Sequence, residues 1–343
     1  MRVPDPRRAA QRPPAPPGYF PPPVVRRRRG CCTLSCLLLL LIPIVCFGSL
    51  LLLYFVVPPE PLDIVILGVD AREGEGWITR TDSIMLLNIT PGKLDVSLLS
   101  IPRDVFIRVP GYGELRVNTI NREAELANLG TGPALVKASF QESFGVEVDH
   151  YVRLDFDAFV ELIDAVGGVT IDVPKRIVDY EFPTHDGSIM QIEFEPGRQK
   201  MDGERALQYA RTRHQDDDYQ RAARQQQVVD ALVRKLTNPL QVVNWPRIAY
   251  VLRSHTDTDL SVWNMLEAGP ALLLGWSGRE TRVLNREDLV GMAAGYWVPD
   301  YEALRPWVEE RFDSTPGASG GCSVRQSAGR TRRSTPRRSA SSS

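Results

Sequence analysis

An uninterrupted apolar run near the N-terminus, residues 31–57, constrains this chain more than any other feature. Its only ionisable side chains are cysteine thiols and the Tyr54 phenol. A run of this length can span a bilayer as a helix. Four arginines, Arg26 to Arg29, precede it and Pro58-Pro59-Glu60 follows it, so the positive-inside rule places the N-terminus in the cytoplasm. We predict one transmembrane helix over 30–57, in the plasma membrane, with the rest of the chain outside.

A cleaved signal peptide is the competing interpretation of this run. It is disfavoured because the apolar stretch exceeds the roughly 7 to 15 residues of such peptides, and because membrane helices tolerate a proline such as Pro43. Four of the five cysteines lie in or beside the run, and Cys322 lies near the C-terminus. The segment between them therefore has no disulfide framework and must rely on its own core.

The two ends of the chain differ in composition from its middle. Residues 1–29 carry eight arginines and one acid, and six arginines follow Asp313 without any acidic residue. Neither end has an apolar pattern that could pack, so we predict disordered basic tails over 1–29, in the cytoplasm, and over 313–343. The net charge of the whole chain is only −1, which means that the central segment, 61–312, is acidic. That segment is long enough for one large domain.

Three apolar runs at the start of the central segment predict an antiparallel meander. They cover 61–70, 83–89 and 94–100, and a TPGK turn joins the last two. In a meander the end of the first strand, the start of the second and the end of the third meet at one edge. We expect that edge to gather Asp70, the TRTD segment 79–82 and the SIPRD segment 100–104.

The remaining pattern predicts an α/β fold in which a mixed central sheet is covered by helices on both faces. A strand, helix, strand succession over 150–156, 157–168 and 169–173 indicates a parallel crossover. Helices are expected near 119–128 and 132–144, a hairpin over 180–198, and mostly helix from residue 202 to about 312.

Asp70 and Asp82 are candidate ligands for a hard cation. Two carboxylates at one sheet edge suit Mg²⁺ or Mn²⁺, whose octahedral shell is usually completed by phosphate and water. The alternative is that one aspartate ends a strand while the other caps a turn. Arg103 and Asp104 follow the third strand, and a plain surface ion pair is the alternative for them.

The segment 206–227, ALQYARTRHQDDDYQRAARQQQ, carries the densest cluster of candidate site residues. Arg221 and Gln225 share a helical stripe with Val228 and Leu232, so they should face the packed side of their helix. Buried arginines need anions, and several guanidinium groups together suit a diphosphate. An arginine–aspartate network internal to the fold is the alternative.

Five motifs in this order, LDIVILGVDAR, TRTDSIMLL, SIPRD, DFDAFVELIDAVGGV and MDGERALQYARTRHQDDDYQRAARQQQ, resemble the LytR-CpsA-Psr family. The resemblance covers about 61–237 well and extends loosely to about 312. It implies an extracytoplasmic catalytic domain that buries a polyprenyl tail between sheet and helices and holds the pyrophosphate at the mouth with a divalent cation. The helix at 157–168 would then wall the tunnel through Phe159, Leu162, Ile163 and Val166. The alternative is an ordinary core helix, which shows the same stripe.

Matched motif by motif, the resemblance assigns roles to individual residues. Asp70 and Asp82 would hold the metal, and Asp218 would be the supporting or proton-accepting carboxylate. Arg103, Arg213 and Arg221 would be catalytic as well as pyrophosphate-binding. The other pyrophosphate contacts would be Arg80, Arg211, Gln225 and Arg116. Arg116 stands where the family usually has a lysine, so it keeps the charge but not the geometry.

The family implies a phosphotransferase that moves a glycopolymer from a polyprenyl-pyrophosphate carrier to a peptidoglycan hydroxyl. A pyrophosphatase acting on the same donor and a non-catalytic glycolipid-binding attachment protein are the alternatives. A nucleic acid partner is not expected, because the acidic central segment lacks the basic face that DNA binding requires.

Overall fold

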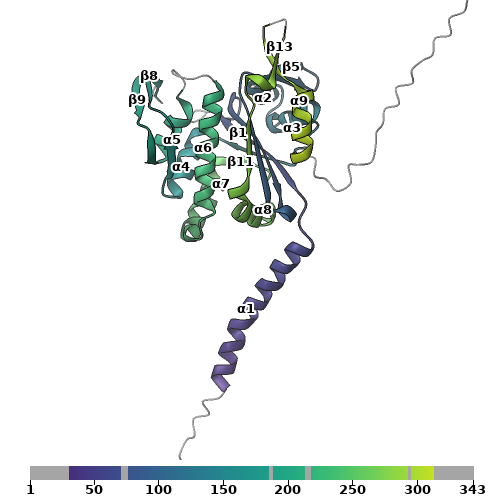
Figure 1. Ribbon diagram of the computed structural model, residues 1–343, viewed down its shortest axis with the longest axis vertical. Coiled ribbons are helices and arrows are strands. Elements are labelled where there is room, and N and C mark those ends of the chain that lie inside the picture. The colour runs from purple at the N-terminus through teal and green to yellow at the C-terminus, as the bar shows by residue number, and fades with distance from the viewer. Residues whose placement is uncertain (1–30, 71–75, 185–187, 213–217, 293–294, 313–343) are drawn as a thin grey trace, which may run out of the picture. The chain divides into compact units, whose positions relative to one another are not determined.

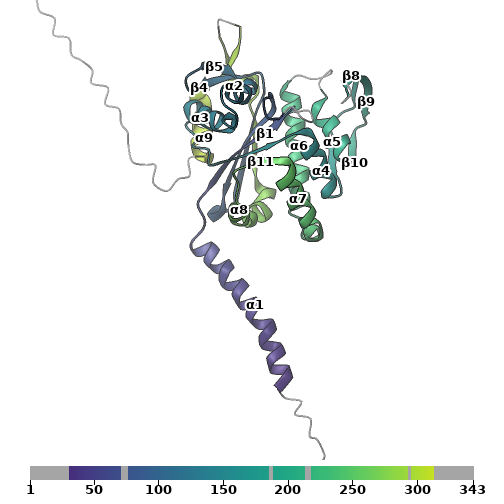
Figure 2. The same cartoon turned by 180° about the vertical axis from the view of Figure 1, so that it is seen from behind.

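The computed structural model describes residues 31–70, 76–184, 188–212, 218–292 and 295–312. The chain divides into two compact units, Met1–Val56 and Val57–Ser343. The second unit is called the body below, and it contains all the strands found among the described residues (Figures 1 and 2).

Among residues 31–56, the described part of the first unit, the structure has the helix α1 (Cys31–Val56), which has 26 residues and includes Pro43. Within the described parts of the chain, no helix meets the length and apolarity needed to cross a membrane. The expected transmembrane helix is therefore not confirmed and stays a prediction.

The core of the body is a six-stranded mixed sheet, confirming the expected sheet type. Its strand order is β11-β6-β1-β2-β3-β12. The pairs β1–β2 and β2–β3 are antiparallel, as the predicted meander requires, whereas β1–β6 and β3–β12 are parallel. The strand bounds are Leu62–Val69 for β1, Thr81–Thr90 for β2, Asp95–Ile101 for β3, His150–Leu154 for β6, Thr256–Thr258 for β11 and Glu280–Val283 for β12.

Helices pack on both faces of this sheet because the side chains of each strand alternate between its faces. Val65 and Leu67 of β1 belong to a cluster with α3 (Gly132–Phe144) and α9 (Tyr301–Phe312). Leu62 and Ile64 of the same strand contact α8 (Val262–Gly275) through Ala268 and Ala271. A short helix, α2 (Ile120–Ala127), precedes α3.

A second core lies beside the sheet and is built from residues 156–255. It contains α4 and the pairs β7–β10 and β8–β9, followed by α5, α6 and α7 (Figure 1). The helix bounds are Phe156–Ala165 for α4, Gly203–Arg211 for α5, Asp218–Leu236 for α6 and Trp245–His255 for α7, and the strand bounds are Val169–Val173 for β7, Ile177–Pro183 for β8, Ile189–Phe194 for β9 and Gly197–Met201 for β10.

The predicted parallel crossover through α4 is wrong. β7 does not join the central sheet but pairs antiparallel with β10, with Val169 opposite Met201. Its side chains alternate between buried and exposed, which is typical of a strand covered on one face, whereas a parallel strand is usually covered on both. Gly167 and Gly168, at φ 77° and 83°, form the turn before it.

The expectation of mostly helix after residue 202 is only partly right. α5 to α9 are present, but β11 and β12 form the two edges of the central sheet. Two hairpins complete the body, β4 (Phe106–Val109) with β5 (Gly113–Arg116) and β13 (Leu289–Gly291) with β14 (Trp297–Pro299). Short 3-10 helices lie at Pro91–Lys93, Val117–Thr119, Pro239–Asn244, Trp276–Gly278 and Arg286–Asp288.

Candidate active site

A cavity of about 130 Å³ lies where β1 and β2 face α4, α5 and α6. Its lining combines ionic and apolar groups. The polar lining residues are Asp70, Asp82, Ser83, Asp155, Arg211, Arg221 and Gln225. The apolar lining includes Ile66, Met85, Leu154, Phe156, Phe159, Phe182, Leu207 and Val228. Such a site can accept a ligand that has an anionic group joined to an apolar chain.

The strand register brings Asp70 and Asp82 to this cavity, as the sequence predicts. Val69 pairs with Thr81, so the residue after β1 and the second residue of β2 meet at the same edge of the sheet. The backbone N–H of Asp70 donates to the Arg80 carbonyl at 3.4 Å, and the Thr79 hydroxyl donates to the Asp70 carbonyl at 2.8 Å. These bonds hold the two ends of the connecting loop together.

The two aspartates fit a magnesium ion that shares its shell with phosphate. Asp70 is exposed and Asp82 half-buried, so both carboxylates are accessible from the cavity. No group of three or more His, Cys, Asp or Glu residues within the described ranges could hold a metal ion by itself. Mg²⁺ commonly takes only one or two carboxylates and draws its remaining ligands from substrate phosphates and water, so a pair is sufficient.

Arg103 is held next to the carboxylates. Its Nη1 lies 3.2 Å from Oδ1 of Asp82, and its Nε lies 3.5 Å from Oδ2 of Asp104. Because these are cation–carboxylate contacts at one sheet edge, Arg103 balances part of the negative charge on Asp82. The expected gathering of SIPRD with the two aspartates is confirmed.

Arg211 and Arg221 contribute positive charge to the cavity from two helices. Arg221 is only 4% exposed, and Gln225 follows it one turn later on α6. Val228, on the same stripe, is buried in the second core, which confirms the predicted inward orientation. The Arg211 guanidinium lies 4.3 Å from the centre of the Phe156 ring, so it stacks on the apolar wall.

Other predicted site residues lie elsewhere. Arg80 is exposed and does not line the cavity. Arg116 is also exposed, pairs with Asp104 at 3.4 Å and stacks on Phe106. Arg213 falls outside the described residues. Asp218 begins α6, but its side chain is likewise outside the description.

Of the four residues expected to line a tunnel, only Phe159 lines the cavity. Phe159 lines the cavity, whereas Leu162, Ile163 and Val166 pack in the second core with β7, α5 and α7. This stripe therefore serves ordinary core packing. Asp155, which the sequence interpretation missed, lines the cavity and caps α4 by accepting the Ala158 N–H at 2.8 Å.

A model of the LytR_cpsA_psr family matches residues 57–309. The chain belongs to this family.

Two relatives of the chain carry the names of transferases. The chain is 29% identical over 230 residues to the polyisoprenyl-teichoic acid–peptidoglycan teichoic acid transferase TagU of Oceanobacillus iheyensis, covering 66% of this chain and 67% of TagU. It is 28% identical over 274 residues to the transferase TagV of Bacillus subtilis, covering 76% of this chain and 67% of TagV. The crystal structure of B. subtilis TagV superimposes with a TM-score of 0.61 at 25% identity, over 75% of this chain and 99% of that one. The chain is thus a transferase with the LytR_cpsA_psr fold.

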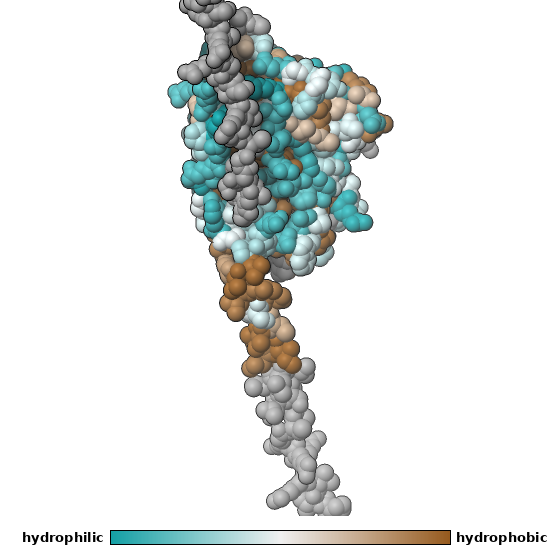
Figure 3. Space-filling view, turned by 90° about the vertical axis from the view of Figure 1, so that its right-hand side faces the viewer, coloured by the Kyte–Doolittle hydropathy of each residue, from teal (hydrophilic) through white to brown (hydrophobic). Residues whose placement is uncertain are grey.

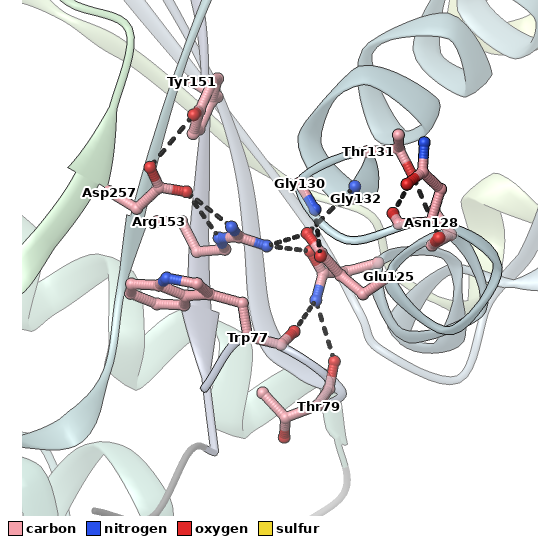
Figure 4. Close-up of polar contacts among 12 residues, drawn as sticks. Trp77, Thr79, Glu125, Asn128, Gly130, Thr131, Gly132, Tyr151, Arg153 and Asp257 are labelled. Carbon is pink, nitrogen blue, oxygen red and sulfur yellow. Dashed lines mark hydrogen bonds and ion pairs between the residues drawn. The ribbon is translucent and has the colours of Figure 1, made fainter. Parts of the chain in front are cut away.

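On the face of the central sheet opposite the cavity, this LytR_cpsA_psr protein has a buried ionic network that the sequence interpretation missed (Figure 4). Arg153 of β6 is 2% exposed and lies 2.7 Å from Glu125 of α2 and 2.6 Å from Asp257 of β11. Its guanidinium also stacks on Trp77, 4.4 Å from the ring centre. An arginine in the apolar strand HYVRLDF was the available signal, because a buried arginine requires partners.

The Arg153 network supports the segment that leads into β2. Asn121 accepts a bond from Arg153 at 2.9 Å and donates its amide to the Trp77 and Thr79 carbonyls, each at 3.0 Å. Burial acts to raise the pKa of Glu125, but bonds from Arg153 and from the N–H groups of Gly130 and Gly132 outweigh it and lower that pKa. Glu125 is therefore held as a carboxylate.

Proposed function

We propose that this protein transfers a glycopolymer from a polyprenyl-pyrophosphate carrier to a hydroxyl of peptidoglycan. The observation that carries the proposal is the cavity, in which arginines and carboxylates adjoin an apolar interior. A pyrophosphate fits the polar part and a hydrocarbon chain fits the apolar part. The names of TagU and TagV, polyisoprenyl-teichoic acid–peptidoglycan teichoic acid transferases, support the same donor and acceptor.

The reaction is a displacement at the phosphorus that carries the glycan. The acceptor oxygen forms a bond to this phosphorus, and the bridging oxygen leaves with the polyprenyl phosphate. The acceptor hydroxyl loses its proton to a carboxylate, for which Asp218 is our choice from the family motif. Phosphoryl transfer needs little covalent help from protein, so catalysis depends on positioning and on positive charge near the reacting oxygens.

The arginines supply that charge from fixed positions. Arg221 and Arg211 would bind the pyrophosphate from α6 and α5, and Gln225 would donate a hydrogen bond from the next turn of α6. Arg103 would reach the same phosphates from the end of β3. Arg213, Arg80 and Arg116 are further contacts proposed from the family motif. Magnesium or manganese, held by Asp70 and Asp82, would neutralise charge on the pyrophosphate when bound.

The proposal places the body outside the plasma membrane, with α1 as a single-pass anchor and the basic N-terminal tail in the cytoplasm. The donor would reach the cavity from the outer leaflet, because its polyprenyl chain resides in lipid. The composition supports this orientation through the arginines that precede α1.

Purified full-length protein, lipid-linked donor and isolated peptidoglycan test the proposal. We expect glycan to become covalently attached to peptidoglycan, with release of polyprenyl phosphate only when peptidoglycan is present. Arg103→Ala should lower turnover by about 100-fold, a loss typical of a transition-state donor. Equal release without peptidoglycan would identify a hydrolase, and unchanged turnover in Arg103→Ala would contradict the site assignment.

A further inference from the structure

The helix α8 has its small residues inside and its large apolar residues outside. Toward the sheet it buries Ala268, Ala271 and Gly275. Its opposite side exposes large side chains. These are Val262 at 74%, Trp263 at 68%, Leu266 at 63%, Leu273 at 49% and Leu274 at 61% exposure.

This distribution is the reverse of an ordinary surface helix. A helix on the surface of a soluble protein normally turns a polar face to water. In α8 the only ionisable residue is Glu267, so the outer side is a continuous apolar strip. Contiguous exposed apolar patches mark sites of contact with a protein partner or with membrane.

α8 lies close to the first residues of the body. α8 packs on the 3-10 helix Pro91–Lys93, and Gly275 abuts the Leu94 carbonyl. A Cβ built on Gly92 would lie 3.0 Å from the Pro58 ring. Residues near the start of the body therefore lie beside α8. Pro58 comes only two residues after the end of α1, a reach of at most about 7 Å of extended chain.

The end of α1 also presents unpartnered apolar side chains. Leu50, Leu52 and Val56 are 65%, 65% and 68% exposed, and most of the coloured part of α1 in Figure 3 is brown, the colour of hydrophobic residues. A lipid bilayer would cover the exposed apolar side chains of both α1 and α8. A second copy of the chain would need a separate complementary surface for each of the two helices.

We infer that α8 rests on the lipid bilayer, with Val262, Trp263, Leu266, Leu273 and Leu274 immersed in the interfacial region. This is contact with the surface of the membrane and not a span, because α8 has 14 residues. Tryptophan suits that depth, since its ring is apolar while its N–H can bond to headgroups or water.

Contact through α8 also gives the lipid chain of the donor a short route. Ile66 packs in the cluster that contains α8 residues, and it lines the cavity as well. The cavity and α8 therefore lie on the same face of the central sheet. This step rests on the proposed function, whereas the membrane contact itself does not.

Fluorescence quenching tests the contact in the full-length protein. The wild type, Trp263→Phe and Trp297→Phe are reconstituted in vesicles of phosphatidylcholine and phosphatidylglycerol, with or without brominated acyl chains. Trp297 is the matched control because it is 38% exposed on β14, whose hairpin partner β13 lies at the opposite end of the body from α8 (Figures 1 and 2). The chain has six tryptophans, so loss of one quenched residue is measurable.

We expect brominated lipid to quench part of the emission of the wild type and of Trp297→Phe. Trp263→Phe should lose most of that quenched fraction. Equal quenching in all three proteins would overturn the inference, as would a failure of the wild type to associate with the vesicles. Quenching absent from the wild type, together with a dimer that Leu266→Glu converts to monomer, would assign the α8 strip to a second copy instead. Donor turnover is not measured, so this result is independent of the proposed reaction.

Discussion

Asp70, just after β1, and Asp82, at the start of β2, line the cavity, and the charge of their carboxylates suits a hard cation. Replacing either with asparagine keeps the shape and removes the charge. We expect each variant to remain folded and to need roughly tenfold or more additional magnesium for half-maximal transfer, the range seen when metal sites lose a supporting group. Asp172→Asn is the control, because Asp172 is exposed on β7 away from the cavity.

Arg221→Lys separates the role of the guanidinium from that of the metal ligands. Lysine keeps one positive charge but cannot form the bidentate hydrogen bonds of a guanidinium to phosphate. Donor affinity and turnover rate should therefore fall, with little change in the magnesium concentration needed for half-maximal transfer. Some coupling is expected because the pyrophosphate itself would ligate the cation. Full activity at low magnesium in all three variants would show that this site assignment is wrong.

The lowered pKa of Glu125 predicts how stability responds to acid. A carboxylate whose pKa is lower in the folded state stabilises the fold above its unfolded pKa, and this contribution is lost as pH falls through the folded pKa. Below about pH 4.3 the wild type should therefore lose stability. Glu125→Gln should begin less stable but show a shallower decline, by at most about 1.4 kcal/mol per pH unit. Urea unfolding of both proteins across this pH range measures the free energies of unfolding. If the two free energies fell in parallel with pH, the prediction would be contradicted.

The sequence predicts the orientation of single side chains best where their spacing places them on one face of a helix together with buried apolar residues. The stripe of Arg221, Gln225 and Val228 could only face inward, and it does. Arg153 was missed because its partners, Glu125 and Asp257, are far away along the chain. Sequence spacing carries no information about such contacts.

Among the elements, α8 offers a matched pair of glycines. A Cβ at Gly275 would overlap the Leu94 carbonyl oxygen, whereas nothing lies within 4 Å of a Cβ at Gly269. We expect Gly275→Ala to reduce the free energy of unfolding by about 1–3 kcal/mol through overpacking. Gly269→Ala should instead raise it by about 0.5–1 kcal/mol, since alanine favours the helical interior. Denaturant unfolding of both variants in one detergent measures the difference, and a gain in both would refute the close packing at Leu94.

The elements themselves were predictable where local pattern decides them, as in the meander of β1, β2 and β3. The pairing of β7 with β10 could not be predicted in this way. A five-residue strand that is buried on one face and exposed on the other can pair with any strand edge that matches this pattern. The edge strands β11 and β12 have three and four residues, too few for a periodic signal.

At the scale of the whole chain, orientation across the membrane is the main prediction. A reporter enzyme that is active only outside the cytoplasm, fused after Ser343, should be active if Arg26 to Arg29 hold the N-terminus inside. The same fusion to a reporter that is active only in the cytoplasm is the control and should be silent. The opposite result would reverse the orientation and exclude peptidoglycan as acceptor.

The sheet order also determines when the body can become complete during synthesis and export. The outer edge of β3 is covered by β12 and that of β6 by β11, although these partners come about 180 and 100 residues later. Until residues 256–283 emerge, the β6 and β3 edges of the central sheet are open and able to pair with other chains. Long loops must close before these contacts form, which slows folding. A nascent chain halted before residue 256 would therefore be exposed to aggregation and proteolysis, although it already carries Asp70, Arg103 and Arg221.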